Sequence, residues 1–258
     1  MIDEPYRWVE AIANRREYIE SELATGSPTV GLSCVEGVLL LTFGKDRKKI
    51  FEIYDQIALG GIGHPGDIER LRMTAIELAS TEGFSRSAND VSLRRMATYN
   101  FSPALKQAFE QIYGAPYLAR LLFAEVGPTP AEDLFVTLDY DGSMTASSMT
   151  SGKGKDHFGV ISGTRRSTGQ IALFLRSIPV GSVESAVTAA VKAWGIGLYS
   201  LDEEHTETPA PEALQSFIKD QLQEYTLETA LLERTPKTRI AFSDLDPDLL
   251  NRVLSEYS

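Results

Sequence analysis

The sequence predicts a four-layer α/β sandwich, in which two antiparallel sheets stack face to face and helix pairs cover both outer faces. Helical and β-rich segments alternate in blocks: helix, strands, two helices, strands, two helices, strands, helix. No region repeats at a short period. The chain has 258 residues, 43% hydrophobic and 24% charged, which suffices for a large core. We therefore expect one domain over residues 1–258, with the sandwich in residues 27–258.

The strands are expected in segments rich in β-branched, aromatic and aliphatic residues. Turn residues such as Gly37, Asp55 and Gly142 separate them. Gly60, Gly61 and Gly63 meet neither the Rossmann nor the P-loop spacing, so close packing is expected there. The expected strands cover residues 29–34, 38–43, 50–54, 56–62, 118–126, 134–140, 157–162, 225–233 and 239–242.

The helices are expected where apolar residues recur every three or four positions. Asp67 is the expected cap of the second helix, and Pro103 should kink or break the third. Asp246 followed by Pro247 begins the last, short helix. The five helices that precede this last one are expected at residues 7–24, 67–82, 90–113, 168–176 and 183–199.

The net charge of −11 limits the possible partners. Residues 202–233 hold nine acids against the single base Lys219, and we interpret residues 202–224 as an acidic connection facing solvent. An acidic surface repels phosphate groups, so nucleic acid and anionic membranes are poor partners. No function is assigned to this stretch.

Cysteine and histidine give no sign of a reaction centre. Cys34 is the single cysteine, so no intramolecular disulfide can form, and a buried inert thiol is expected. His64, His157 and His205 lie in different elements without metal-ligand spacing. No cofactor is expected. The start of the sequence lacks signal-peptide features and no apolar run could span a bilayer, so a cytoplasmic location is expected.

Several segments resemble the proteasome α-type subunits, in their bacterial form. Residues 16–31 (REYIESELATGSPTVG) are similar to the pattern in which a helix leads through Gly-Ser-Thr into the first strand. Further similar segments follow in the order of that family, at residues 49–55 (KIFEIYD), 89–95 (NDVSLRR), 122–126 (LFAEV), 139–143 (DYDGS) and 157–163 (HFGVISG). The resemblance covers nearly the whole chain.

This resemblance implies a fold, an assembly and a role. The fold would be that of the Ntn hydrolases, and the chain would form heptameric rings that flank rings of catalytic β subunits. The outer ring would gate the entry of protein substrates and dock a ring-shaped ATPase activator. The chain itself would be a non-catalytic subunit of the core particle.

An alternative is a self-processing hydrolase with Ser27 as nucleophile. Catalytic β subunits use an N-terminal threonine whose free amine takes part in the reaction. Ser27 aligns with that position, but its amine lies in the peptide bond from Gly26, and Phe43 aligns with the catalytic carboxylate. Cleavage after Gly26 would be required, so we favour the non-catalytic interpretation.

Two sites follow from the resemblance. Lys49 aligns with the lysine that pairs with the terminal carboxylate of an activator tail, while the neighbouring Lys48 should point to the opposite face of a strand. The gate is expected in residues 1–8, ahead of the leading helix at 7–24. Its expected residues are Asp3, Glu4, Pro5, Tyr6, Arg7 and Trp8.

Overall fold

The computed structural model describes residues 4–45, 47–111, 113–149, 156–205 and 207–257. The Ser-Gly-Lys segment at residues 151–155, for which the sequence predicts a flexible connection between strands, lies outside this part of the chain. Two five-stranded antiparallel sheets form the centre of the molecule. The first contains, in spatial order, β10 (Phe242–Ser243), β9 (Thr226–Glu233), β2 (Gly37–Gly44), β1 (Thr29–Ser33) and β8 (Phe158–Ile161). The second contains β3 (Ile50–Tyr54), β4 (Ile57–Gly63), β5 (Ala119–Glu125), β6 (Leu134–Leu138) and β7 (Met144–Ser147).

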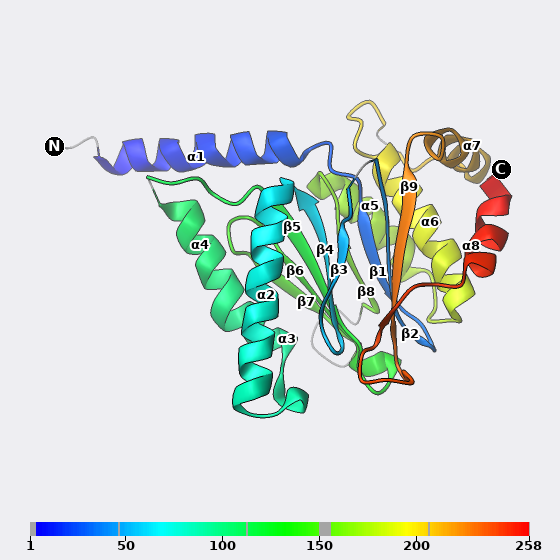
Figure 1. The fold of residues 1–258 in the computed structure, drawn as a ribbon. Coiled ribbons are helices and arrows are strands. Elements are labelled where there is room, and N and C mark those ends of the chain that lie inside the picture. Colours follow the sequence, from blue (N-terminus) through cyan, green and yellow to red (C-terminus); the bar gives the residue numbers. More distant parts are fainter. Residues whose placement is uncertain (1–3, 46, 112, 150–155, 206, 258) are drawn as a thin grey trace.

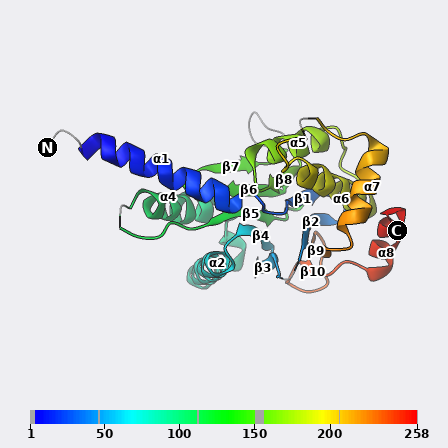
Figure 2. The same ribbon diagram turned by 90° about the horizontal axis from the view of Figure 1, so that it is seen from above.

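Helices cover the outer face of each sheet, and one helix runs across an end of the sandwich (Figures 1 and 2). The second sheet is covered by α2 (Pro65–Ser85), α3 (Leu93–Met96) and α4 (Ser102–Glu110). The first sheet is covered by α5 (Arg165–Arg176), α6 (Val183–Tyr199), α7 (Pro211–Gln221) and α8 (Pro247–Leu254). The leading helix α1 (Glu4–Leu23) ends above the second sheet in Figure 1 and projects outward over α4. The predicted four-layer sandwich is confirmed.

Strand alternation divides the buried side chains among the three spaces between layers. In β2, Val38 and Leu40 face the space between the sheets, while Leu39 and Leu41 face the helices of the first sheet. In β5 the same alternation sends Leu122 between the sheets and its neighbours Leu121 and Phe123 toward α2 and α3. Each central strand is buried on both faces, which explains why its sequence is apolar throughout.

Helices α2 and α5 both begin earlier than predicted. Helix α2 begins at Pro65 after His64, two residues earlier than expected, and Asp67 is not its cap. The Asp67 carboxylate instead accepts a hydrogen bond from the backbone N–H of Leu118 (2.9 Å), which ties α2 to the start of β5. Helix α5 begins at Arg165 rather than residue 168, because the Thr164 side chain caps it by accepting from the N–H of Ser167.

The helix expected at residues 90–113 is not a regular α-helix over that range. A 3₁₀ turn covers Ala88–Asp90, Ser92 caps α3, and a π-helical turn at Ala97–Phe101 leads into α4. Pro103 lies in the first turn of α4, directly after the π turn. Because proline cannot donate to a carbonyl four residues back, the wider turn accommodates the break in the hydrogen-bond ladder.

Two elements were not predicted. Strand β7 is short and only partly buried, so its sequence lacks the apolar alternation that indicates a strand. Helix α7 lies within the stretch interpreted as an acidic connection. Only Leu214 and Ile218 of α7 are buried, and these two side chains pack against α6 at Gly195. The acidic residues of α7 cover its exposed face.

The packing glycines and the cysteine behave as predicted. A Cβ at Gly60 would lie 2.7 Å from the Thr29 side chain of the other sheet, and one at Gly61 would lie 3.0 Å from Ile68 of α2. Cys34 is fully buried, and burial raises the pKa of its thiol to about 11. The thiol is therefore protonated at neutral pH and unreactive.

Candidate functional site

Lys49 lies at the end of the loop that joins the two sheets, directly before β3. Its ammonium donates hydrogen bonds to the carbonyl oxygen of Ser27 (2.7 Å) and to Oγ1 of Thr42 (3.0 Å). The side chain is half-buried, and this burial lowers the pKa of Lys49 to about 8, although the charge of Glu228 opposes the shift. Lys49 is thus a cation held at a fixed point rather than a mobile surface lysine.

The ammonium adjoins a hollow of about 730 Å³, which we call the Lys49 pocket. Three further bases from the same loop, Lys45, Arg47 and Lys48, line it. Phe51, Ile62 and Ile68 supply apolar wall, and Glu69 is the acid among the lining residues. The other lining residues are Thr25, Gly26, Ser27, Gly44, Gly61, Gly63, Pro65 and Tyr225. The pocket combines an excess of positive charge with an apolar wall. It therefore suits a ligand that has a carboxylate and an apolar side chain.

The prediction that Lys48 points away from Lys49 is wrong. Strand β3 begins at Ile50, so neither lysine lies within the strand and strand alternation does not apply to them. Lys48 is exposed, lines the same pocket, and has its ammonium 6.0 Å from the centre of the Phe51 ring. It therefore cannot serve as a control for Lys49.

The hydroxyl of Ser27 is enclosed on the side away from this pocket. Ser27 Oγ donates to the carbonyl oxygen of Phe43 (2.7 Å) and accepts from Nε1 of Trp194 (2.9 Å). The rings of Phe43 and Trp194 are tilted against each other with centroids 4.1 Å apart, and both are fully buried. Both hydrogen bonds of the hydroxyl are thus made to structural groups, and neither partner is a carboxylate or a base.

The expected gate residues lie mostly in the first turns of α1. The helix begins at Glu4, three residues earlier than predicted, so Glu4, Pro5, Tyr6 and Arg7 have helical backbones. Asp3 lies outside the described residues. Trp8 is 43% exposed, and Figures 1 and 2 show this end of α1 pointing away from the sandwich.

A buried charge network anchors the other end of α1. Arg120 of β5 is 5% exposed and forms ion pairs with Glu20 of α1 and with Asp139. Its guanidinium also donates to the carbonyl oxygens of Ser162 and Gly163, and the Tyr140 hydroxyl donates to Glu20. The sequence analysis missed this network, although an arginine within an apolar strand is a signal of a buried ion pair.

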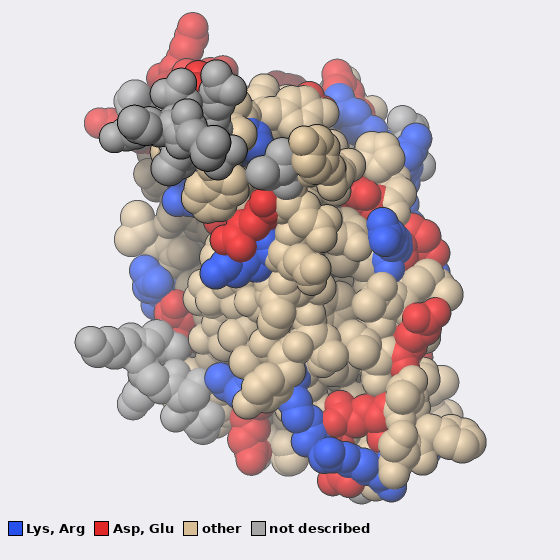
Figure 3. Space-filling model, turned by 90° about the vertical axis from the view of Figure 1, so that its left-hand side faces the viewer, with Lys and Arg blue, Asp and Glu red and all other residues tan. Residues whose placement is uncertain are grey.

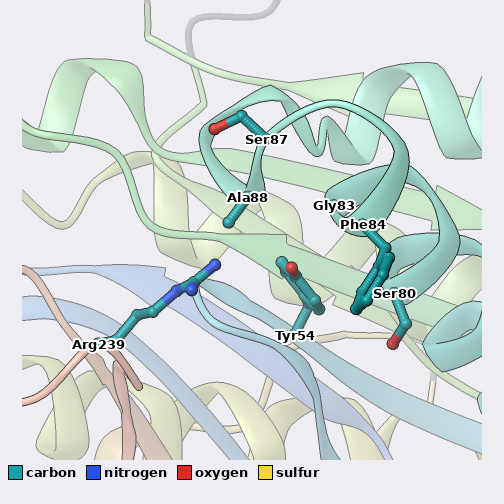
Figure 4. Close-up of a pocket in the computed structure, with 7 residues that line it drawn as sticks. All are labelled: Tyr54, Ser80, Gly83, Phe84, Ser87, Ala88 and Arg239. Atoms are coloured by element: carbon teal, nitrogen blue, oxygen red, sulfur yellow. The ribbon is translucent and has the colours of Figure 1, made fainter.

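A second hollow opens at the opposite end of the sandwich (Figure 4). Arg239 points toward Tyr54 at the end of β3, and Ser80 and Phe84 come from the last turns of α2. Arg239 also forms an ion pair with Asp55, and Phe84 is 98% exposed. None of the residues predicted for a site lies here.

The surface seen from the projecting side of α1 is uncharged in its centre. Figure 3 shows a broad band of neutral residues there, with Lys, Arg, Asp and Glu gathered toward the edges. Within the described ranges, no group of three or more His, Cys, Asp or Glu side chains could hold a metal ion. Among these same residues, no helix is long and apolar enough to cross a membrane.

Comparison with known proteins places the chain in a family. A model of proteasome subunits matches residues 23–160. The chain belongs to the proteasome subunit family. This match includes Ser27, Phe43 and Lys49, whereas Trp194 and Tyr225 lie beyond it.

The relatives are bacterial proteins named proteasome subunit alpha. The one from Mycolicibacterium vanbaalenii is 29% identical over 96% of this chain and 88% of its own length. The one from Jonesia denitrificans is 28% identical over 89% of this chain and 88% of its own length. The one from Acidothermus cellulolyticus is 31% identical over 52% of this chain and 58% of its own length. The predicted resemblance to bacterial α subunits of the proteasome is confirmed.

Proposed function

We propose that the chain is a non-catalytic α subunit of a proteasome core particle, which gates substrate entry and docks a ring-shaped ATPase through the Lys49 pocket. The single observation that carries the docking role is the fixed ammonium of Lys49 beside a basic and partly apolar hollow. A chain-terminal carboxylate would pair with this ammonium, and an apolar side chain of the same tail would pack on the wall.

The non-catalytic role is supported by the surroundings of Ser27. Its hydroxyl bonds to Phe43 and Trp194, and its amine is part of the chain that continues from α1. Helix α1 is anchored through Ile19 and Leu23, which are buried against Phe109 and Tyr140. Removal of residues 1–26 would expose this apolar surface, which argues against the alternative of a self-processing hydrolase.

The assembly that follows has several partners. A catalytic β-type subunit would supply the nucleophile, seven copies of this chain would form the outer ring, and protein substrates would pass through it. We place this assembly in the cytoplasm. The projecting half of α1 fits such a ring, because an isolated helix of this length is marginal in water without a packing partner.

Substitution of Lys49 tests the docking role. The particle is assembled with its β partner, and hydrolysis of a fluorogenic peptide is measured with an acetylated Gly-Ser-Gly-Leu-Phe-Leu peptide that has either a free or an amidated carboxyl end. Loss of a charged partner in a half-buried pair should reduce carboxylate-dependent stimulation about tenfold or more in Lys49→Ala.

Lys237→Ala is the matched control. Lys237 is exposed, and it lies in the segment after β9 that also carries Arg239, at the end of the sandwich opposite the Lys49 pocket. This variant should respond like the original chain. Equal responses of the two variants, with intact rings, would refute the docking role.

Deletion of residues 1–6 tests the gate. If these residues narrow the axial pore, their loss should raise the rate at which the assembled particle hydrolyses small peptides about severalfold, because entry and not chemistry would be limiting. Rates are compared with those of a particle carrying Trp8→Ala, which leaves the length of the chain unchanged. Identical rates for the deletion and the original chain would mean that this segment does not close the pore.

A further inference from the structure

Glu228 holds the backbone of the residue that we propose to dock an activator. One carboxylate oxygen accepts from the backbone N–H of Ile50 (2.8 Å), and the other accepts from the N–H of Lys49 (2.8 Å). Glu228 lies on β9 of the first sheet, whereas Ile50 is the first residue of β3 in the second sheet. A single side chain thus ties the two sheets together at the base of Lys49.

The strand partner of Glu228 holds the other end of the same lysine. Thr42 of β2 pairs with Glu228 in the β2–β9 ladder, and its hydroxyl accepts from the Lys49 ammonium (3.0 Å). The Thr42 hydroxyl itself donates to the carbonyl oxygen of Pro28 (2.7 Å), so it has a fixed orientation. The cross-strand pair Thr42–Glu228 therefore fixes Lys49 both at its backbone and at its ammonium.

We infer that Glu228 is a positioning residue for the Lys49 pocket, whose carboxylate holds the lysine backbone so that an incoming terminal carboxylate meets a fixed cation. This inference rests on the proposed docking function. A glutamine at this position keeps one acceptor oxygen but places an NH₂ group toward a backbone N–H, so one of the backbone bonds is lost.

The charge of Glu228 matters as well as its hydrogen bonds. Burial lowers the pKa of Lys49 and the negative charge of Glu228 raises it, so removal of that charge favours the neutral amine. Docking needs the protonated form, which is lost as pH rises through the pKa. The other ionisable groups that line the pocket are Lys45, Arg47 and Lys48 of the loop, Glu69 of α2 and Tyr225 before β9.

The test compares Glu228→Gln with Glu233→Gln in assembled particles. Glu233 lies on the same strand but at its far end, opposite Gly37, so the chemical change is identical and remote from the pocket. Stimulation by the same free-carboxylate hexapeptide is titrated at about pH 6.5, where Lys49 is protonated, and at about pH 8, close to its pKa.

We expect Glu228→Gln to raise the half-stimulating peptide concentration about fivefold at pH 8 and less than about twofold at pH 6.5, with unchanged hydrolysis at saturating peptide. Glu233→Gln should match the original chain. A Glu228→Gln particle that behaves like the original at both pH values overturns the inference.

A Glu228→Asp variant provides a second test if the Glu228→Gln particle does not assemble. Aspartate keeps the charge but is one methylene shorter, so it should weaken the response while leaving the original pH dependence. A response equal to that of the original chain would contradict the positioning role. If Lys49→Ala leaves the response intact, the docking function itself fails, which is a different result from failure of Glu228 alone.

Discussion

The hydroxyl and the carbonyl oxygen of Ser27 lie in two regions with opposite properties, one closed and one open. On the hydroxyl side, Phe43 and Trp194 fill the space and satisfy Ser27 Oγ. On the carbonyl side, the chain opens to the Lys49 pocket and accepts a hydrogen bond from the docking lysine. A residue that aligns with the nucleophile of catalytic subunits is thus held in structural hydrogen bonds, and we propose that its carbonyl oxygen supports binding by holding Lys49.

The difference arises from two side chains. Phe43 places an apolar ring where the family's catalytic subunits have a carboxylate, and Trp194 of α6 packs on that ring. A carboxylate in this fully buried position would need a partner for its charge, whereas an aromatic pair needs only space. The closed side therefore contributes stability, and we propose that the open side contributes binding.

Truncation of Trp194 should have the largest effect, on the closed side. Trp194→Ala removes a fully buried ring and should lower the free energy of unfolding by about 3–5 kcal/mol. Urea unfolding followed by circular dichroism at one protein concentration gives this value. The other tryptophan provides the control, because Trp8 is 43% exposed and Trp8→Ala should change stability by about 0.5 kcal/mol or less. Similar losses for both variants would contradict a packed closed side.

A smaller effect is expected when only the Ser27 hydroxyl is removed. Ser27→Ala leaves the Trp194 indole N–H without its acceptor, which should cost about 1–2 kcal/mol in the same unfolding measurement. The carbonyl that holds Lys49 remains, so stimulation by the free-carboxylate peptide should be unchanged. If peptide hydrolysis by the particle were lost instead, Ser27 would belong to the chemistry and the comparison would fail.

The sequence predicted those parts of the fold that depend on local patterns. Helix α6 was predicted at its observed bounds, because the segment is rich in Ala and Val; in the structure the Ser182 side chain caps it. Helix α8 was likewise predicted from Asp246 and Pro247, and the Asp246 side chain accepts from the N–H of Asp248. The exposed helix α7 was missed because few of its residues are buried.

Contacts between distant residues could not be predicted from local patterns. Arg120 and Glu20 are 100 residues apart, and nothing in the sequence near either one indicates the other. Lys49 was found through the resemblance to a family, whereas its bonds to Ser27 and Thr42 and the bonds of Glu228 depend on how the two sheets meet. Lys48 was misplaced because strand alternation was applied to residues 48 and 49, although both precede β3, which begins at Ile50 as predicted.

The central claim is that this chain shapes an entrance and a docking pocket while a partner cuts the substrate. The most direct test is the intact mass of the chain in a particle assembled with its β subunit, combined with peptide hydrolysis after the β nucleophile has been substituted. The account predicts a chain of about 28.4 kDa that retains α1, and no remaining hydrolysis. A chain that begins at Ser27 and still hydrolyses peptides would contradict it.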